Sequence, residues 1–193
     1  MTAGPSGREG GAPGVTITER PFLAAASLTP RAGRREALAT RLADRFGLVL
    51  PLQPRRSAAG PVSLVWSGPS QWLAFDEARQ GMARFMFSHD LAEVTGDAAS
   101  VTELSGARAV FHLAGPDAQE ALTRLVPIDL DPAAFPPGAA ALTLAGHVGV
   151  MLWRRGDAGE SFEICCYRSF ARSLAEALVE AARPFGCLVA PAS

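Results

Sequence analysis

The sequence contains no lysine, so its basic residues are all arginines. Schiff-base catalysis and the phosphate-binding Walker A loop both use a lysine amine, and the sequence therefore excludes these two chemistries. The 18 basic residues face 19 aspartates and glutamates, which leaves a formal net charge of −1. Proteins that bind nucleic acid by electrostatic attraction have a basic excess, so we expect no nucleic-acid partner.

Cysteine is also scarce, and its spacing indicates neither a disulfide framework nor a metal site. Cys165 and Cys166 are adjacent, Cys187 stands alone, and no C-x-x-C occurs. We therefore expect buried, reduced thiols in a cytoplasmic protein. No apolar run reaches the roughly 18–20 residues of a membrane-spanning helix, and the N-terminus lacks the apolar segment of a signal peptide. We expect no membrane partner.

The motifs of common cofactor and catalytic sites are missing as well. None of His89, His112 and His147 has a second ligand at metal-binding spacing. No G-x-G-x-x-G follows a strand pattern and no G-x-S-x-G is present, so neither a dinucleotide site nor a hydrolase nucleophile is indicated. We predict that the chain carries no cofactor, no metal and no catalytic residue.

What is present is typical of a globular protein, with 48% hydrophobic and 19% charged residues over 193 positions. Residues 1–14 are rich in glycine, proline and alanine, and we predict a disordered tail there. The rest, 15–193, is interpreted as one domain with a first half over about 15–105 and a second half over about 106–186.

The first half shows the pattern strand, helix, strand, strand, helix, strand, which is typical of a ferredoxin-like unit. Its first strand lies within 15–28. A helix follows with Leu38, Leu42 and Phe46 on one face, ended by Gly47. A loop is expected over 48–61, a hairpin from 62–66 and 71–75, and a helix over 77–91. On that second helix Met82, Phe85, Met86 and His89 share one face, which is expected to lie in the core, with His89 half-buried at its end.

The second half is expected to start with a hairpin turn at Ser105-Gly106 and an alternating strand over 107–113. A helix beginning at Pro116-Asp117 presents a buried stripe made of Ala118, Ala121, Leu122 and Leu125. Strands over 139–145, 150–154 and 162–168 precede a closing helix over 169–183, which is expected to bury Phe170, Leu174, Leu178 and Ala181. The predicted fold is α+β, with two ferredoxin-like (split β-α-β) halves that share a core.

Four residues are candidates for a protein interface. Trp66 and Trp72 flank the turn of the predicted hairpin, where they either pack in the core or anchor a partner. Arg108 and His112 share the outward face of one strand, which is either a binding surface or a solvated face.

Several motifs resemble a known family. Leu104-Ser105-x-x-Arg108 and Gly115-Pro116-Asp117-Ala118 resemble the start of the second half of the folate-binding domain of glycine-cleavage T-proteins, the aminomethyltransferases, and their relatives. A more specific series is similar to the gamma subunits of heterotetrameric sarcosine oxidases. It consists of Val126-Pro127-Ile128-Asp129-Leu130, Phe135-Pro136-Pro137-Gly138, Thr143 and Arg168-Ser169-Phe170-Ala171-x-x-Leu174. The resemblance covers roughly 17–186.

The resemblance implies a non-catalytic subunit with a T-protein-like folate-binding fold. In that family the beta subunit carries the flavins, the alpha subunit the nicotinamide dinucleotide (NAD) and the folate-binding domain, and the delta subunit zinc. The expected partners are thus the alpha, beta and delta subunits. The assembled enzyme oxidatively demethylates sarcosine to glycine, produces hydrogen peroxide and passes the one-carbon unit to tetrahydrofolate.

Two alternatives stay open. A stand-alone aminomethyltransferase is the first, although the chain is shorter than a full T-protein and Glu103 is no clear match for that family's folate-orienting carboxylate. A free-standing folate-binding or regulatory module is the second. The folate-domain relatives that maintain iron–sulfur proteins carry Lys-Gly-Cys-Tyr-x-Gly-Gln, and the run 165–168 lacks its lysine and both glycines.

Overall fold

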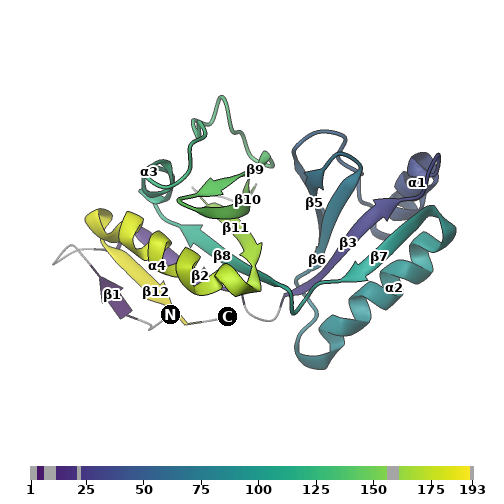
Figure 1. The fold of residues 1–193 in the computed structure, drawn as a ribbon, viewed down its shortest axis with the longest axis horizontal. Coiled ribbons are helices and arrows are strands. Elements are labelled where there is room, and N and C mark those ends of the chain that lie inside the picture. The colour runs from purple at the N-terminus through teal and green to yellow at the C-terminus, as the bar shows by residue number, and fades with distance from the viewer. Residues whose placement is uncertain (1–3, 7–11, 21–22, 156–160, 192–193) are drawn as a thin grey trace. The chain divides into compact units, whose positions relative to one another are not determined.

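The computed structural model describes residues 4–6, 12–20, 23–155 and 161–191. The chain divides into unit 1, which comprises Met1–Pro21 and Arg108–Ser193, and unit 2, which comprises Phe22–Ala107. Each unit contains a β-sheet with α-helices packed along it (Figure 1). The α+β class and the two ferredoxin-like halves predicted from the sequence are confirmed by this arrangement. The buried residues of the described chain fall into two core clusters, one in each unit, and not into the single shared core that was predicted.

Unit 2 is a ferredoxin-like unit with one added strand. Its sheet has the order β4-β5-β6-β3-β7, and neighbouring strands are antiparallel. Without β4, this is the β-α-β-β-α-β order expected from the sequence. The elements are β3 (Ala24–Pro30), α1 (Arg35–Phe46), β4 (Arg56–Ala59), β5 (Val62–Gly68), β6 (Gln71–Asp76), η1 (Gly81–Phe85), α2 (Met86–Thr95), η2 (Gly96–Ala98) and β7 (Ala99–Glu103). Strand β4 lies where a loop was predicted.

Helix α1 forms as its sequence predicts. Leu38 and Leu42 are fully buried in the core of unit 2, and Phe46 packs against that core. Gly47 ends the helix in the left-handed conformation, with φ of 69°; its N–H donates to the carbonyl of Ala43, and the N–H of Leu48 donates to that of Leu42. A glycine tolerates this φ without a steric penalty, so the helix stops here.

The second helix of unit 2 differs from the prediction in both start and phase. A 3₁₀ segment, η1, covers Gly81–Phe85, and α2 begins only at Met86. Because a 3₁₀ helix has three residues per turn and an α-helix 3.6, the predicted stripe over 82–89 is broken. Phe87, Leu91 and Thr95 face the core instead, whereas Met82 is 80% and Met86 51% exposed.

Unit 1 has the same ferredoxin-like strand order as unit 2, with one additional strand inserted into its sheet. Its sheet runs β1-β12-β2-β8-β11-β10-β9. Taking β8, β10, β11 and β12 as the four ferredoxin-like strands, β2 is inserted between the first and the fourth, parallel to β12 and antiparallel to β8. The elements are β1 (Gly4–Ser6), β2 (Val15–Glu19), β8 (Arg108–Ala114), α3 (Ala118–Thr123), β9 (Ala140–Ala145), β10 (Val148–Arg154), β11 (Ser161–Tyr167), η3 (Arg168–Phe170), α4 (Ala171–Ala182), η4 (Arg183–Phe185) and β12 (Cys187–Ala190).

The N-terminal segment corrects two predictions. Gly4–Ser6 are not a disordered tail, because they form β1 and pair with β12. Strand β2 belongs to the sheet of unit 1 and not to the first half, since it pairs with β8 and β12. The N–H of Gly14 also donates to the Phe185 carbonyl over 3.1 Å. Local composition could not reveal these pairings because they join residues far apart in the chain. The predicted tail residues 1–3 and 7–11 lie outside the described residues.

The predicted hairpin at Ser105-Gly106 is wrong. Strand β7 pairs with β3 in the sheet of unit 2, whereas β8 pairs with β2 and β11 in the sheet of unit 1. Ser105 instead forms a hydrogen bond within unit 2, because its buried Oγ accepts the N–H of Ala25 over 3.0 Å. The turn residues were identified correctly, but they connect two sheets.

Helices α3 and α4 close the core of unit 1. The predicted stripe on α3 is confirmed, since Ala118, Ala121 and Leu122 are buried and Leu125 packs against them. On α4, Leu174 and Leu178 are buried as predicted, but Phe170 is 48% exposed. Phe170 lies in the 3₁₀ turn η3 before α4 starts, so it does not follow the phase of that helix.

Candidate functional site

Of the four interface candidates, the two tryptophans belong to unit 2. Trp72 is 1% exposed, and its indole Nε1 donates to the carbonyl of Pro51 over 2.8 Å. Trp66 is its cross-strand partner and packs, partly buried, against the same core. The core interpretation therefore applies to Trp72, which has no surface to offer a partner.

Arg108 and His112 lie on one face of β8 in unit 1 and remain partly exposed. The pairing with β11 places Arg108 opposite Tyr167 and His112 opposite Glu163. Four steps along the strand place Arg108 and His112 about 13 Å apart, so the two residues lie beside different neighbours.

The first group gathers around Tyr167, where β11 ends. The guanidinium carbon of Arg108 lies 3.8 Å from the centroid of the Tyr167 ring. Arg168 donates to the Arg108 carbonyl over 2.7 Å and to the Glu19 carboxylate over 3.0 Å. Tyr167 is 56% exposed, and Phe170 follows three residues later with a similar exposure. The group thus presents two aromatic rings at the surface beside two arginines.

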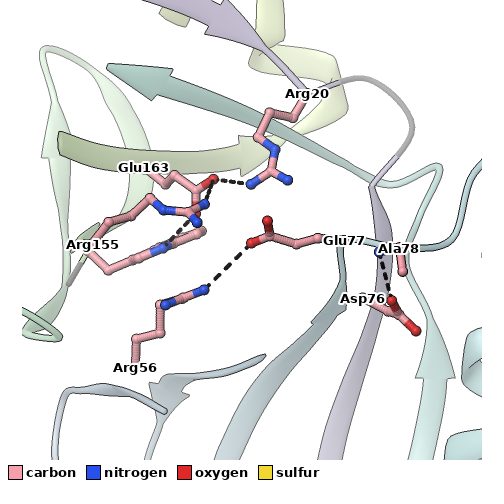
Figure 2. Close-up of polar contacts among 8 residues, drawn as sticks. Arg20, Arg56, Asp76, Glu77, Ala78, Arg155 and Glu163 are labelled. Atoms are coloured by element: carbon pink, nitrogen blue, oxygen red, sulfur yellow. Dashed lines mark hydrogen bonds and ion pairs between the residues drawn. The ribbon is translucent and has the colours of Figure 1, made fainter. Parts of the chain in front are cut away.

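The second group surrounds Glu163, a carboxylate that is 2% exposed on β11 (Figure 2). Its Oε2 accepts the indole N–H of Trp153 over 2.8 Å, and its Oε1 accepts from Arg155 over 3.1 Å. Arg20 donates to the same Oε1. A buried charge is tolerated when it is paired and hydrogen-bonded in this way. To act as a general base, Glu163 would have to break these bonds, so its geometry favours a structural role.

The sequence interpretation did not identify Glu163. The signal was present, because a glutamate in the apolar run 161–167 has to find partners inside the protein. The partners could not be identified in advance, since Arg20 lies 143 residues away in sequence.

Unit 2 has smaller polar contacts of its own, and Figure 2 draws those of Arg56 with Glu77 and of Asp76 with Ala78. The Arg56 and Glu77 side chains form an ion pair at 3.5 Å. The buried Asp76 accepts the N–H of Ala78 and the Nε of Arg79, each over 2.9 Å. These contacts lie at the start of β4 and the end of β6, and both carboxylate oxygens of Asp76 accept a hydrogen bond.

The three cysteines are buried and free, as expected. Burial raises the pKa of Cys165 to about 12 and that of Cys166 to about 11, and it also raises the pKa of Cys187. At neutral pH these thiols stay protonated, which makes them poor nucleophiles. Among the described residues, no three potential ligands gather as a metal site would require. Within the same part of the chain, no helix is both long and apolar enough to cross a membrane.

Comparison with known proteins identifies the family. The model of the GCVT N-terminal domain matches residues 72–191. The sarcosine oxidase subunit gamma of Corynebacterium sp. (strain P-1) is 31% identical over 154 residues, which are 78% of this chain and 68% of the relative. The corresponding subunit of Arthrobacter sp. is 34% identical over 118 residues, 60% of this chain, and the chain spans only 56% of that relative's length.

A solved structure supports the same assignment. A chain of the heterotetrameric sarcosine oxidase from Corynebacterium sp. U-96, in complex with pyrrole 2-carboxylate, matches with a TM-score of 0.76 and 27% identity. The match covers 91% of this chain and 87% of that one. These findings confirm the resemblance inferred from the motifs: the chain contains a GCVT N-terminal domain and belongs to the family of sarcosine oxidase gamma subunits.

Proposed function

We propose that the chain is a non-catalytic gamma subunit that supports assembly of a heterotetrameric sarcosine oxidase. The observation that carries this proposal is the structural match over 91% of the chain to a chain of such an enzyme. The chemistry of the site agrees with it. The buried carboxylate of Glu163 is held by three donors, and the thiols of Cys165 and Cys166 are kept protonated by burial.

The proposal extends to the partners and cofactors. The chain assembles with alpha, beta and delta subunits, and it carries none of the cofactors itself. Flavins, NAD, tetrahydrofolate and zinc belong to the partner subunits. The complex oxidatively demethylates sarcosine to glycine and transfers the one-carbon unit to tetrahydrofolate.

Co-expression with candidate alpha, beta and delta subunits tests this function. We expect the chain to co-purify in a stable complex that consumes sarcosine in a peroxide-coupled assay. Single changes of the three histidines to alanine are expected to leave turnover nearly unchanged, whereas loss of a general acid or base would cost about 10²–10⁴ in rate. If the chain remains separate from the other three subunits, the subunit function is refuted.

The match to the GCVT N-terminal domain favours one second candidate, a stand-alone folate-binding aminomethyltransferase-like protein. Calorimetry of the isolated chain with tetrahydrofolate, together with an aminomethyl-transfer assay, distinguishes the two. Stoichiometric binding together with aminomethyl transfer by the chain alone would support the second candidate, and the absence of both would exclude it.

A further inference from the structure

Two large aromatic side chains of unit 1 lie at the surface close together in sequence. Tyr167 is 56% and Phe170 48% exposed. Neither sits on a loose segment, because Tyr167 is the last residue of β11 and Phe170 directly precedes α4, whose Leu174 is fully buried. Aromatic residues are enriched in protein interfaces relative to the rest of the surface, so two exposed rings on a well-packed framework are candidates for contact with a partner.

The Tyr167 ring is held in place by arginines. Arg108 is its cross-strand partner and stacks its guanidinium on the ring at 3.8 Å. Arg168 donates a hydrogen bond of 2.7 Å to the backbone carbonyl of Arg108 and forms an ion pair with Glu19. A ring that is already immobilised loses little entropy on binding, and preordering of this kind raises affinity.

Charge around the rings is unevenly compensated. The nearby carboxylates of Glu19 and Glu176 are paired with Arg168 at 3.0 Å and Arg172 at 2.9 Å. Among the residues that the structure describes, the contact observed for the Arg108 guanidinium is the Tyr167 ring, and its buried Nε has no hydrogen-bond partner. A stacked arginine whose charge lacks a carboxylate is well suited to an ion pair across an interface.

We propose that Arg108, Tyr167, Arg168 and Phe170, here called the Tyr167 surface, form the docking surface for another subunit of the oxidase complex. The partner contributes an apolar pocket that receives the two rings and a carboxylate that pairs with Arg108. This inference rests on the proposed subunit function. The composition supports it, since tyrosine and arginine dominate interface hot spots.

Other exposed apolar side chains fit this role less well. Met82 and Met86 lie on η1 and the start of α2, and Leu142 and Leu144 on the edge strand β9. In η1, Arg84 does stack on a ring, that of Phe85 at 4.5 Å, but Phe85 is less exposed than Tyr167 or Phe170. Of these apolar side chains, Met82 provides a control for the experiment.

The test measures how strongly variants of this chain bind the complex of the other three subunits. Tyr167→Ala, Phe170→Ala and Arg108→Gln are compared with Met82→Ala, which removes an 80% exposed apolar side chain from unit 2, and with Arg172→Ala, which removes a neighbouring arginine that is 91% exposed. Thermal melting of each isolated variant establishes that it is folded. Binding is measured at two or more salt concentrations.

We expect the two aromatic truncations to raise the dissociation constant at least tenfold and the two controls to change it less than threefold. Arg108→Gln should weaken binding and also reduce its dependence on salt, because it removes a charge from the interface. If the parent chain binds and all three variants bind as tightly as the parent, the Tyr167 surface is refuted while the subunit function stands. A loss confined to Met82→Ala would also refute it and place the interface on unit 2. If the parent chain itself does not bind, the subunit function fails and this inference with it.

Discussion

Removal of the Glu163 carboxylate is expected to destabilise unit 1 strongly. The side chain of Glu163 is 2% exposed, and those of its partners Arg20 and Arg155 are 19% and 18% exposed. Glu163→Ala leaves two largely buried guanidinium groups and the indole N–H of Trp153 without this acceptor. Breaking a buried ion pair from one side costs about 3–5 kcal/mol, which is a large part of the roughly 5–15 kcal/mol that stabilises a typical domain.

Urea denaturation at neutral pH, followed by circular dichroism, measures this cost. Glu163→Gln separates charge from hydrogen bonding, because its amide oxygen still accepts from Trp153 while the charge is lost; we expect about 1.5–3 kcal/mol. Glu180→Ala is the matched control. Its pair with Arg183 is exposed on both sides, and such pairs contribute about 0–1 kcal/mol.

The urea midpoints of Glu163→Ala and Glu180→Ala decide whether the network around Glu163 stabilises the fold. If Glu163→Ala unfolds at the same urea concentration as Glu180→Ala, the network around Glu163 does not stabilise the fold and the structural role inferred for it is wrong. High salt should leave the effect of Glu163→Ala almost unchanged, since buried pairs are weakly screened.

Three further predictions concern the core and the termini of unit 1. Leu122→Ala should cost about 2–5 kcal/mol in thermal or urea unfolding, because Leu122 is 1% exposed; parent-like stability would contradict the packing of α3. Gly14→Ala should cost about 1–3 kcal/mol, since its Cβ would lie 2.6 Å from the Phe185 carbonyl oxygen, whereas Gly106→Ala, with open space around it, should be neutral; equal melting temperatures would refute this. Burial raises the pKa of Cys165 from 9.0 to about 12, so the unfolded state loses its proton first and stability should fall as pH rises above about 9. In Cys165→Ala that fall should be smaller, and an unchanged pH profile would show that Cys165 does not cause it.

Much of the fold follows from local patterns. The stripes on α1 and α3 and the alternation along β8 are periodicities of neighbouring residues, and each correctly indicates the buried face. The motifs at 126–138 and 168–174 are sufficient to indicate the family, and the comparisons confirm it.

The features that the sequence did not reveal depend on distant partners or on a local change of helix type. Strand β2 joins unit 1 through pairs with β8 and β12, which no local pattern can show. The 3₁₀ turn η1 shifts the phase of α2 and exposes Met82, and η3 exposes Phe170 in the same way. Of the predicted interface residues, Trp72 is core, whereas Arg108 acquires its significance from Tyr167, its neighbour across the sheet.

Native mass spectrometry of the co-expressed subunits tests the central claim most directly. If this chain is a gamma subunit, the purified oxidase contains it together with the alpha, beta and delta subunits, and a preparation made without it yields less assembled complex. A three-subunit oxidase that forms equally well without this chain, or a co-expression from which this chain is recovered free, would contradict the account.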